Sequence, residues 1–455
     1  MIQENQKIRS LSKHTAKYTA KFTAKFTVRM AVGFAVGLLI ATSGAPNASA
    51  MSKIRQKFSG SSDVKISEFS QEDSKSIKIM SYNVHNFFDA EGDTDSHGNV
   101  KYDHEFLPEG HPKKKTGCRN QRDDNRLKCN RISDPVGREK CIVKEDRYYV
   151  SCLKKDWTQE KVTLKLNQFE SALRDAGDAL PDVLALQEIE NENVVQMIAT
   201  RLGYTSFGVT ESPDIRGIDV AILVKENSNL RLVQTNEYPI TGPNFTDHPT
   251  RNILEAQLSV GGHTVFTYVV HWPSQGAPAP VRVDVAKQMM TVIGNRLTRN
   301  PNVEIIVMGD FNTIPQDFPH PFHAVLMSGD YGNGLALTDV HEAFMKDFSV
   351  PYGIKRGIPL GSYFYATDMT WNKLDHFFVS PNLMDKTGLE VDIPTYRIYA
   401  PDHLKSEYTY TRYKNEPFYG STIKGVPYRY THFGSGSTTK PGYSDHFPII
   451  VNLKY

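Results

Sequence analysis

Residues able to take part in phosphoester chemistry follow directly after apolar stretches of the chain. The run Ile305–Met308 leads into Gly309 and Asp310, and Asn312 comes two residues later. A buried strand that ends in a carboxylate delivers a charged group to the edge of a hydrophobic core. Asp310 can hold a cation or polarise a water molecule, and Asn312 offers both a donor and an acceptor. These residue types suit cleavage of a phosphoester bond.

The same arrangement recurs elsewhere in the chain. Asn83, Glu188 and His271 each follow an apolar run. Two Asp-His pairs, Asp375-His376 and Asp445-His446, adjoin further apolar runs. A single histidine or carboxylate of this kind is more often structural than catalytic. The functional prediction therefore depends on the set and not on any one member.

Strands and helices must position these residues. Apolar runs predict strands over residues 77–83, 183–186, 220–224, 253–258 and 265–270. One helix is expected after the N-cap residue Thr158 and a second between Asn191 and Gly203. A third is expected with Val285, Met289 and Ile293 facing inward. Because strand follows strand between residues 204 and 270, we expect mostly antiparallel pairing.

The first 50 residues have the composition of a secretory signal peptide. A cationic segment precedes the apolar run Ala31–Ala41, and Ala48-Ser49-Ala50 resembles a cleavage site. A membrane anchor would need about 20 apolar residues, and this run is too short. We therefore expect export to the periplasm or the extracellular space, with no membrane anchor in the mature chain. Residues 51–76 are polar and are interpreted as a linker to a domain at 77–455.

The four cysteines lie in a charged segment, residues 90–157, that shows little periodicity. They are Cys118, Cys129, Cys141 and Cys152. An even number of cysteines in an exported chain favours two disulfides, and three pairings are possible. A zinc site is the alternative, but the close Cys-x-x-Cys pairs typical of such sites are missing. We interpret the segment as an insertion that is cross-linked because it lacks a hydrophobic core of its own.

Two further features of this insertion leave alternatives open. Asp93, Asp95, His97 and Gly98 are similar to the start of a calcium-binding loop, but His104 occupies the position of the final glutamate. A solvated acidic turn is favoured over a structural Ca²⁺ site. A basic run is either a phosphate-binding arm or a solvated face. It consists of Lys113, Lys114, Lys115, Arg119, Arg122, Arg126, Lys128 and Arg131. Without the signal segment the chain is slightly acidic, so a polyanionic substrate would require local basic groups and bound cations.

The ordered set of motifs resembles the endonuclease/exonuclease/phosphatase superfamily, and in particular its deoxyribonuclease-like bacterial extracellular nucleases. In chain order the motifs are Tyr82-Asn83, Gln187-Glu188, Arg216-Gly217-Ile218-Asp219, His271-Trp272, Gly309-Asp310-Phe311-Asn312, Leu374-Asp375-His376 and Ser444-Asp445-His446. The resemblance spans residues 77–453. It implies an α/β (α+β) fold, a four-layer α/β sandwich of two mostly antiparallel sheets flanked by helices, with the active site where strand ends converge.

The same resemblance implies roles for individual residues. Glu188 matches the principal ligand of Mg²⁺ or Mn²⁺, with Asn83 beside it and Asp445 as a further ligand. Asp310 matches the residue that positions or deprotonates the attacking water. Asn312 matches a contact to the phosphate or leaving group. The remaining matches are His446 and His271 at the scissile phosphate, Asp375 orienting His446, and Arg216 and Arg251 contacting substrate.

These roles imply a metal-dependent phosphodiester hydrolase in which an activated water attacks phosphorus in line. Among the family's activities, a secreted nuclease is favoured. We expect it to act on DNA rather than RNA and to be a monomer. A sphingomyelinase-like enzyme is the alternative. Inositol phosphatases are disfavoured because Val307-Met308 precedes Gly309 and Lys373-Leu374 precedes Asp375. Every residue of these motifs is present, which argues against a binding module without activity.

A second predicted insertion, residues 382–443, is rich in tyrosine. Its tyrosines are Tyr396, Tyr399, Tyr408, Tyr410, Tyr413, Tyr419, Tyr428 and Tyr430. They would either stack on unpaired bases or pack within edge strands and loops. Packing is the more economical interpretation.

Overall fold

The computed structural model describes residues 75–94, 103–174, 180–431 and 441–455. The predicted signal peptide, the linker up to residue 74, and Asp95, His97 and Gly98 lie outside these described residues. The described residues form one compact unit. Within the described ranges, no helix has both the length and the apolar character needed to span a bilayer.

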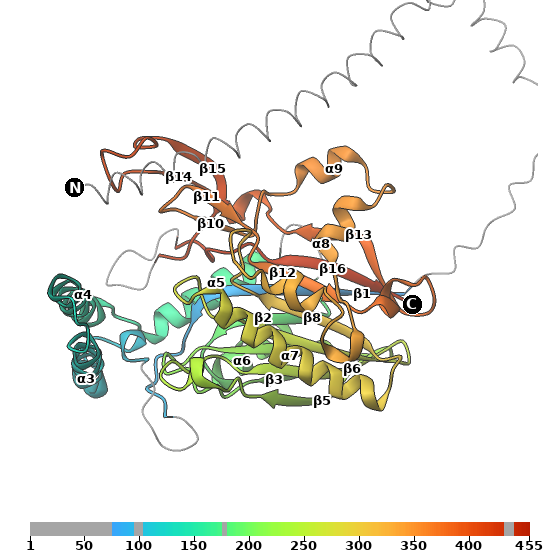
Figure 1. The fold of residues 1–455 in the computed structure, drawn as a ribbon, viewed down its shortest axis with the longest axis horizontal. Helices are drawn as coiled ribbons and strands as arrows, with labels where there is room; N and C mark the ends of the chain where they lie inside the picture. Colours follow the sequence, from blue (N-terminus) through green and yellow to red (C-terminus); the bar gives the residue numbers. More distant parts are fainter. Residues whose placement is uncertain (1–74, 95–102, 175–179, 432–440) are drawn as a thin grey trace, which may run out of the picture. The chain divides into compact units, whose positions relative to one another are not determined.

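Two six-stranded sheets pack face to face and carry helices on their outer faces (Figure 1). The first sheet has the order β13 (Glu390–Ile398), β16 (Ile449–Lys454), β1 (Ser76–Phe87), β2 (Val183–Ile189), β4 (Asp219–Val224) and β3 (Ser206–Val209). The second has the order β5 (Leu230–Tyr238), β6 (Ile253–Val260), β7 (His263–His271), β8 (Glu304–Asp310), β12 (Asp375–Val379) and β9 (Thr338–Asp339). Pairing within these sheets is antiparallel except between β1 and β2 and between β7 and β8. The predicted fold class is confirmed.

Strand β8 shows why the central strands are continuously apolar. Side chains alternate between the two faces of a strand. Ile306 and Met308 belong to the core between the sheets. Ile305 and Val307 belong to a second core that also contains Met289 and other residues of helix α7 (Ala279–Arg299). Both faces of β8 are therefore buried, and the strand ends at the buried residue Asp310.

The predicted helices next to the first sheet also form. Helix α5 (Gln159–Leu173) begins after Thr158, whose side chain makes no capping hydrogen bond. Helix α6 (Glu192–Leu202) is capped by Asn191, whose Oδ1 accepts from Val194 N at 3.0 Å. It ends at Gly203, which adopts the left-handed conformation (φ 74°) that glycine tolerates best.

The cysteine-containing insertion is regular, in contrast to its weak periodicity. It folds as a helical hairpin of α3 (Pro112–Cys129) and α4 (Pro135–Lys154). Each helix has proline in its first turn and a side-chain N-cap, from His111 and Asp134. Few apolar side chains are buried between the helices, and the nested disulfides Cys118–Cys152 and Cys129–Cys141 hold them together. The disulfide pairing, open from the sequence, is resolved in this way.

Contacts within the insertion bear on the two open alternatives. Asp93 accepts a hydrogen bond from Asn191 Nδ2 (2.7 Å), and its backbone N donates to Asp103 (2.8 Å), as in an acidic turn. Lys114 is buried and donates to the backbone carbonyls of His104 and Leu107. Arg126 pairs with Asp146. Part of the basic run is therefore structural or neutralised.

Shorter elements cover one edge of the sandwich. They are α8 (Val340–Lys346), α9 (Tyr352–Gly357), the hairpin of β10 (Tyr363–Tyr365) and β11 (Thr370–Asn372), and the hairpin of β14 (Lys405–Thr409) and β15 (Thr422–Pro427). Tyr396, Tyr410 and Tyr430 of the tyrosine-rich segment are buried. For these three side chains the structure favours packing over base stacking.

Candidate active site

Strand register brings the predicted site residues to one edge of the two sheets. In the second sheet, His271 of β7 is paired with Asp310 of β8, and Asp310 is paired in turn with Asp375 of β12. In the first sheet, Asn83 of β1 is aligned with Gln187 of β2, the residue before Glu188. Asn83 and Asp310 then meet across the sandwich, where Asn83 Nδ2 donates to Asp310 Oδ2 at 3.0 Å.

Unusual backbone conformations occur where these strands end. Glu188 and Asn312 have positive φ values of 63° and 47°. Gly309 has φ 142°, and a Cβ atom at this position would lie 1.9 Å from Val270 O. Non-glycine residues with positive φ values, such as Glu188 and Asn312, are strained and often occur at functional sites. Gly309 is thus required for the close approach of β7 and β8 beside Asp310.

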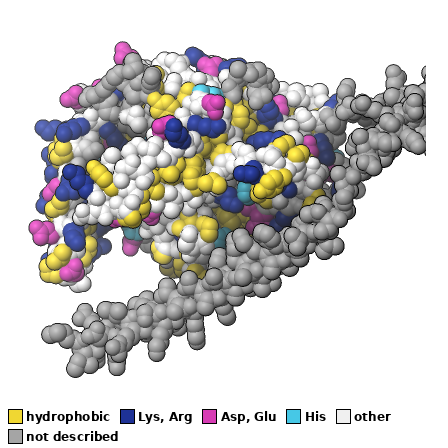
Figure 2. Space-filling model, turned by 90° about the horizontal axis from the view of Figure 1, so that it is seen from above, with side chains coloured by type: hydrophobic (Ala, Val, Ile, Leu, Met, Phe, Trp, Pro, Cys, Tyr) yellow, Lys and Arg dark blue, Asp and Glu magenta, His cyan; other side chains and the backbone are white. Residues whose placement is uncertain are grey.

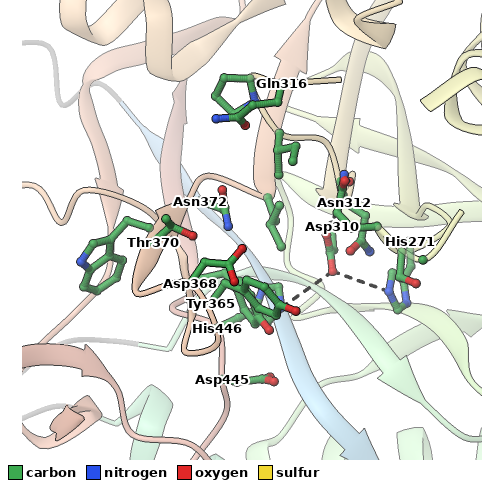
Figure 3. Close-up of a pocket in the computed structure, with 18 of the residues that line it drawn as sticks. His271, Asp310, Asn312, Gln316, Tyr365, Asp368, Thr370, Asn372, Asp445 and His446 are labelled. Atoms are coloured by element: carbon green, nitrogen blue, oxygen red, sulfur yellow. Dashed lines mark hydrogen bonds and ion pairs between the residues drawn. The ribbon is translucent and has the colours of Figure 1, made fainter. Parts of the chain in front are cut away.

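Asp310 is the centre of the cluster. Its Oδ1 accepts from Asn312 N at 2.8 Å. Its Oδ2 lies 3.6 Å from His271 Nε2 and 3.8 Å from His446 Nε2 (Figure 3). Burial raises the pKa of Asp310 to about 7, helped by the nearby Asp375 and Glu188 carboxylates and opposed by His446. A carboxylate with a pKa near neutrality is well matched to accepting a proton.

The two histidines are held in different charge states. Burial alone would lower the pKa of His446, but Asp375, hydrogen-bonded through Oδ2 to His446 Nδ1 at 2.8 Å, outweighs it, and the pKa rises to about 10. His271 is also buried, and with Arg251 and Arg216 nearby its pKa is well below the ordinary value. His446 is therefore cationic and His271 neutral near pH 7.

Glu188 and Asn83, the predicted ligands of a divalent cation, lie beside each other, and Asn83 Oδ1 accepts from His85 N at 3.0 Å. Asn83 Nδ2 lies 3.3 Å from Glu188 Oε1, and burial together with Asp445 raises the pKa of Glu188. Asp445 Oδ1 is buried without a hydrogen-bond partner among the described residues. Among all the residues that the structure describes, no group of three or more His, Cys, Asp or Glu side chains is arranged to hold a metal ion. Mg²⁺ requires fewer protein ligands, because it retains waters and takes oxygens from the substrate.

The two arginines are placed differently. Arg216 is half exposed, lines the cavity and pairs with Asp214 Oδ2 at 2.7 Å. Arg251 is buried, and it donates to His271 O at 3.0 Å, to Trp272 O, and to Asp214 Oδ2 at 3.1 Å. Arg216 is accessible to a substrate phosphate, whereas the hydrogen bonds of Arg251 support the backbone at His271.

Lys165 is a functional candidate that the motifs do not include. Its buried ammonium donates to Val84 O (2.8 Å), His85 O (3.1 Å) and Tyr443 O (3.3 Å). The first two carbonyls follow Asn83 and the third precedes Asp445 by two residues, so one side chain joins both segments of the predicted metal site. A lysine on the otherwise apolar face of the predicted helix after Thr158 is the sequence signal that could have indicated it.

The cavity around these residues has a volume of about 1160 Å³. Glu188, His271, Asp310 and His446 contribute to one side of it. Further lining residues come from the β10–β11 hairpin, namely Tyr365, Asp368, Thr370 and Asn372, which lie away from His271 in Figure 3. None of the tyrosines named in the predicted insertion 382–443 is among the described lining residues. The aromatic wall of the site therefore comes from a hairpin that the sequence did not indicate.

A family model described as "Endonuclease/Exonuclease/phosphatase family" matches residues 139–455. The chain belongs to this family. The predicted family is thus confirmed, and it supports hydrolysis of phosphoester bonds in an enzyme class that generally uses divalent metals. The predicted extracellular nuclease branch remains a prediction. No curated protein sequence matches the chain.

Three solved structures illustrate the structural likenesses. An endonuclease/exonuclease/phosphatase family protein from Bacteroides thetaiotaomicron is 14% identical, with coverage of 84% of this chain and 98% of that chain and a TM-score of 0.41. The catalytic domain of human Nocturnin with bound sulfate is 14% identical, with coverages of 83% and 94% and a TM-score of 0.40. TDP2 from D. rerio, complexed with a single-strand DNA product, is 16% identical, with coverages of 64% and 92% and a TM-score of 0.38.

Proposed function

We propose that the protein is a divalent-metal-dependent phosphodiesterase whose substrates are nucleic acids. The observation that carries this proposal is the position of Asp310, which has a proton-accepting oxygen between a neutral His271 and a cationic His446. Such a group is suited to activate water beside a cation that can neutralise a phosphate.

In the proposed reaction, Asp310 accepts a proton as water attacks phosphorus. The bond from phosphorus to the leaving oxygen breaks, and this oxygen departs with the bonding electron pair and takes a proton from solvent. Negative charge grows on the phosphate oxygens, and the Nε2–H of His446 can donate to one of them. His446 keeps this orientation because its Nδ1–H is bound to Asp375. Asn312 is fixed by its own side-chain bond to Trp272 O (3.1 Å), beside the leaving group.

Glu188 and Asn83 would hold Mg²⁺ or Mn²⁺, with Asp445 as a further ligand. The bound ion supplies neutralisation of the phosphate charge. Arg216 adds a guanidinium at the open side of the cavity, and its hydrogen bonds to Asp214 hold it there. Since Arg251 is bound to carbonyls, its contribution is to position His271.

The organisation of the whole chain follows from the same proposal. Residues 1–50 are a signal peptide that directs export, residues 51–76 are a linker, and residues 77–455 are a monomeric catalytic domain. Two disulfides suit an oxidising compartment. We favour DNA over RNA as substrate. A structural Ca²⁺ near Asp93 remains the less favoured alternative to an acidic turn.

A phospholipid phosphodiesterase is the second candidate, because one segment beside the site exposes large apolar side chains. Phe348, Tyr352 and Leu360 are strongly exposed, and Leu360, 77% exposed, also lines the cavity. Figure 2 shows hydrophobic side chains among Lys and Arg side chains on this face of the molecule. A membrane surface would be contacted by such a segment.

The purified protein, incubated with Mg²⁺ and with plasmid DNA, single-stranded DNA, RNA or sphingomyelin vesicles, tests both candidates. We expect cleavage of DNA that stops with chelator and returns with Mg²⁺ or Mn²⁺. The variant Glu188→Gln should lose activity and also lose the rise in Tm that Mg²⁺ causes in the wild type. Hydrolysis of sphingomyelin alone would establish the second candidate. Metal-independent DNA cleavage would refute the assignment of Glu188.

A further inference from the structure

The cavity extends beyond the phosphate-binding residues to the β10–β11 hairpin, which has no role in the reaction described above. We propose that this hairpin binds an unpaired nucleobase next to the scissile phosphate, with the Tyr365 ring as its stacking surface. The inference rests on the proposed nuclease function and specifies the substrate as single-stranded nucleic acid.

The register of the hairpin separates a binding face from an anchoring face. Tyr363 pairs with Asn372, and Tyr365 pairs with Thr370. Because side chains alternate along strands, these four residues share one face, and all four line the cavity. Phe364 and Trp371 form the intervening pair on the other face, with ring centroids 5.4 Å apart, and Trp371 also borders the cavity.

The anchoring contacts hold the hairpin against the catalytic segment. Trp371 stacks on Phe447 at 6.3 Å, and Phe447 N donates to Ser362 O at 2.7 Å. The hydroxyl of Ser362 accepts from Asp375 N at 3.2 Å. The hairpin is thus tied to residues adjacent to both His446 and Asp375, so its position relative to the phosphate site is fixed.

Tyr363 and Tyr365 lead outward from the phosphate site. The Tyr363 ring centroid lies 4.9 Å from that of His446, and the two residues form a backbone bridge. Tyr365 lies two residues further along the same face and is 41% exposed. A substrate whose phosphate contacts His446 would therefore place its adjoining base near the Tyr365 ring.

The side chains around Tyr365 suit a nucleobase. Its ring offers a flat aromatic surface, on which any base can stack. Thr370 and Asn372 provide hydrogen-bond donors and acceptors for base edges, and Asp368 provides acceptors. These residues lie away from His271 in Figure 3. A base in a duplex must first be unstacked to reach this position, which favours single strands.

The test compares a single-stranded oligodeoxynucleotide with an abasic strand of equal length, using the wild type and Tyr365→Ala. We expect Tyr365→Ala to lower kcat/KM on the base-bearing strand by about 5- to 150-fold, equivalent to about 1–3 kcal/mol of stacking. Activity on the abasic strand should be unchanged. Tyr365→Phe, which retains the ring, should behave as the wild type.

Tyr413→Ala is the matched control. Tyr413 is 51% exposed between β14 and β15, outside the described cavity lining, so its loss should change neither rate. Equal losses on both strands, or no loss on either, would overturn the inference while leaving the phosphodiesterase function intact. A wild type that cleaves neither strand would refute the proposed nuclease function itself.

Discussion

Asp375 and His446 are joined by a hydrogen bond of 2.8 Å although 71 residues separate them in the chain. Asp375 begins β12, which pairs with the strand of Asp310, and His446 precedes β16 in the other sheet. The Asp375 carboxylate therefore holds the imidazole of His446 with its Nε2 3.8 Å from Asp310 Oδ2. His376, the sequence neighbour of Asp375, turns away and pairs with Asp339. The adjacent residues Asp375 and His376 thus contact different parts of the protein.

This pairing predicts coupled effects of mutation. His446→Ala should reduce kcat by at least ~10²-fold, because it removes the cationic donor at the phosphate. Asp375→Asn should cause a smaller loss, since the imidazole would remain but lose its orienting partner. The double variant should be little worse than His446→Ala, because the two residues act as one unit. Steady-state kinetics on DNA would measure all three effects.

Replacement of His323 provides the control for this cycle, because this histidine is exposed outside the cavity. His323→Ala should retain full activity. The Tm of each variant separates catalytic loss from unfolding. If the single variants at positions 446 and 375 keep normal kcat, or lose activity only in proportion to folded protein, their proposed roles are incorrect.

Lys165→Met should weaken the response to metal. The substitution keeps an unbranched side chain but leaves three buried carbonyls without their donor, which costs about 1–3 kcal/mol of unfolding free energy. Because those carbonyls flank Asn83 and Asp445, the Mg²⁺ concentration needed for half of the Mg²⁺-induced rise in Tm should increase several-fold.

Lys161→Met is a matched variant one turn earlier in α5. Lys161 is also buried, but it donates to Asp156 O, away from the site. It should lower Tm without changing the Mg²⁺ midpoint. If both variants have the wild-type midpoint, Lys165 supports the fold alone.

The helical hairpin should depend on its disulfides more than the sandwich does. On reduction, we expect proteases to cut between residues 112 and 154 before they cut the sheets, because α3 and α4 bury few apolar side chains. The pair Cys118–Cys152 closes the longer loop, so replacing both of its cysteines by serine should have the larger effect. Limited proteolysis with mass spectrometry would identify the first cuts. First cleavage within β1 or β8 would contradict this expectation.

The strands and their terminal residues could be predicted because the physical signal is local. β2 and β8 are largely buried on both faces, so each contains an apolar run, residues 183–186 and 305–308, that leads into polar residues. Asn191 and Gly203 mark the ends of α6 by local capping chemistry. The resemblance to the family then predicted that these strand ends meet in one site, although they are far apart in the chain.

Other features depended on contacts between distant segments. Lys165 is 278 residues from Tyr443 in sequence, and nothing near it in the chain indicates that carbonyl. β10 and β11 have three residues each, which is too short for a periodic signal. Helices α3 and α4 lack a strong apolar stripe because disulfides and polar contacts hold them. In each case the stabilising partner is known only from the folded structure.

The His376–Asp339 pair should produce a measurable dependence of stability on pH. His376 Nδ1 lies 2.9 Å from Asp339 Oδ2, and Nε2 lies 2.9 Å from Lys373 O, so both ring nitrogens face acceptors and both carry protons. Burial opposes this charge, but Asp339 outweighs it and raises the pKa of His376. Burial likewise opposes the charge on Asp339, yet His376 holds the pKa of that carboxyl below its usual value.

The signs of these shifts define the pH range. The raised pKa of His376 stabilises the fold fully below about pH 6.5, the pKa of an unfolded histidine. This contribution is lost as the pH rises through the higher pKa of His376 in the folded protein. The lowered pKa of Asp339 stabilises the fold fully above about pH 3.9, the pKa of an unfolded aspartate. This contribution is lost as the pH falls through the lower pKa of Asp339 in the folded protein. The pair therefore contributes most between about pH 4 and 6.5. His376→Phe, which preserves the aromatic packing, should lower Tm most in that range and less at alkaline pH.

His341 supplies a control of opposite sign. Burial lowers the pKa of His341 to about 4, so the unfolded chain binds the proton more readily as pH falls below ~6.5. His341→Phe should therefore raise Tm relative to the wild type at pH 4–5 and have less effect at pH 8. Thermal unfolding of both variants from pH 4 to 9 would measure the two slopes. A difference between His376→Phe and the wild type that is constant across this range would show that His376 is not charged in the folded protein.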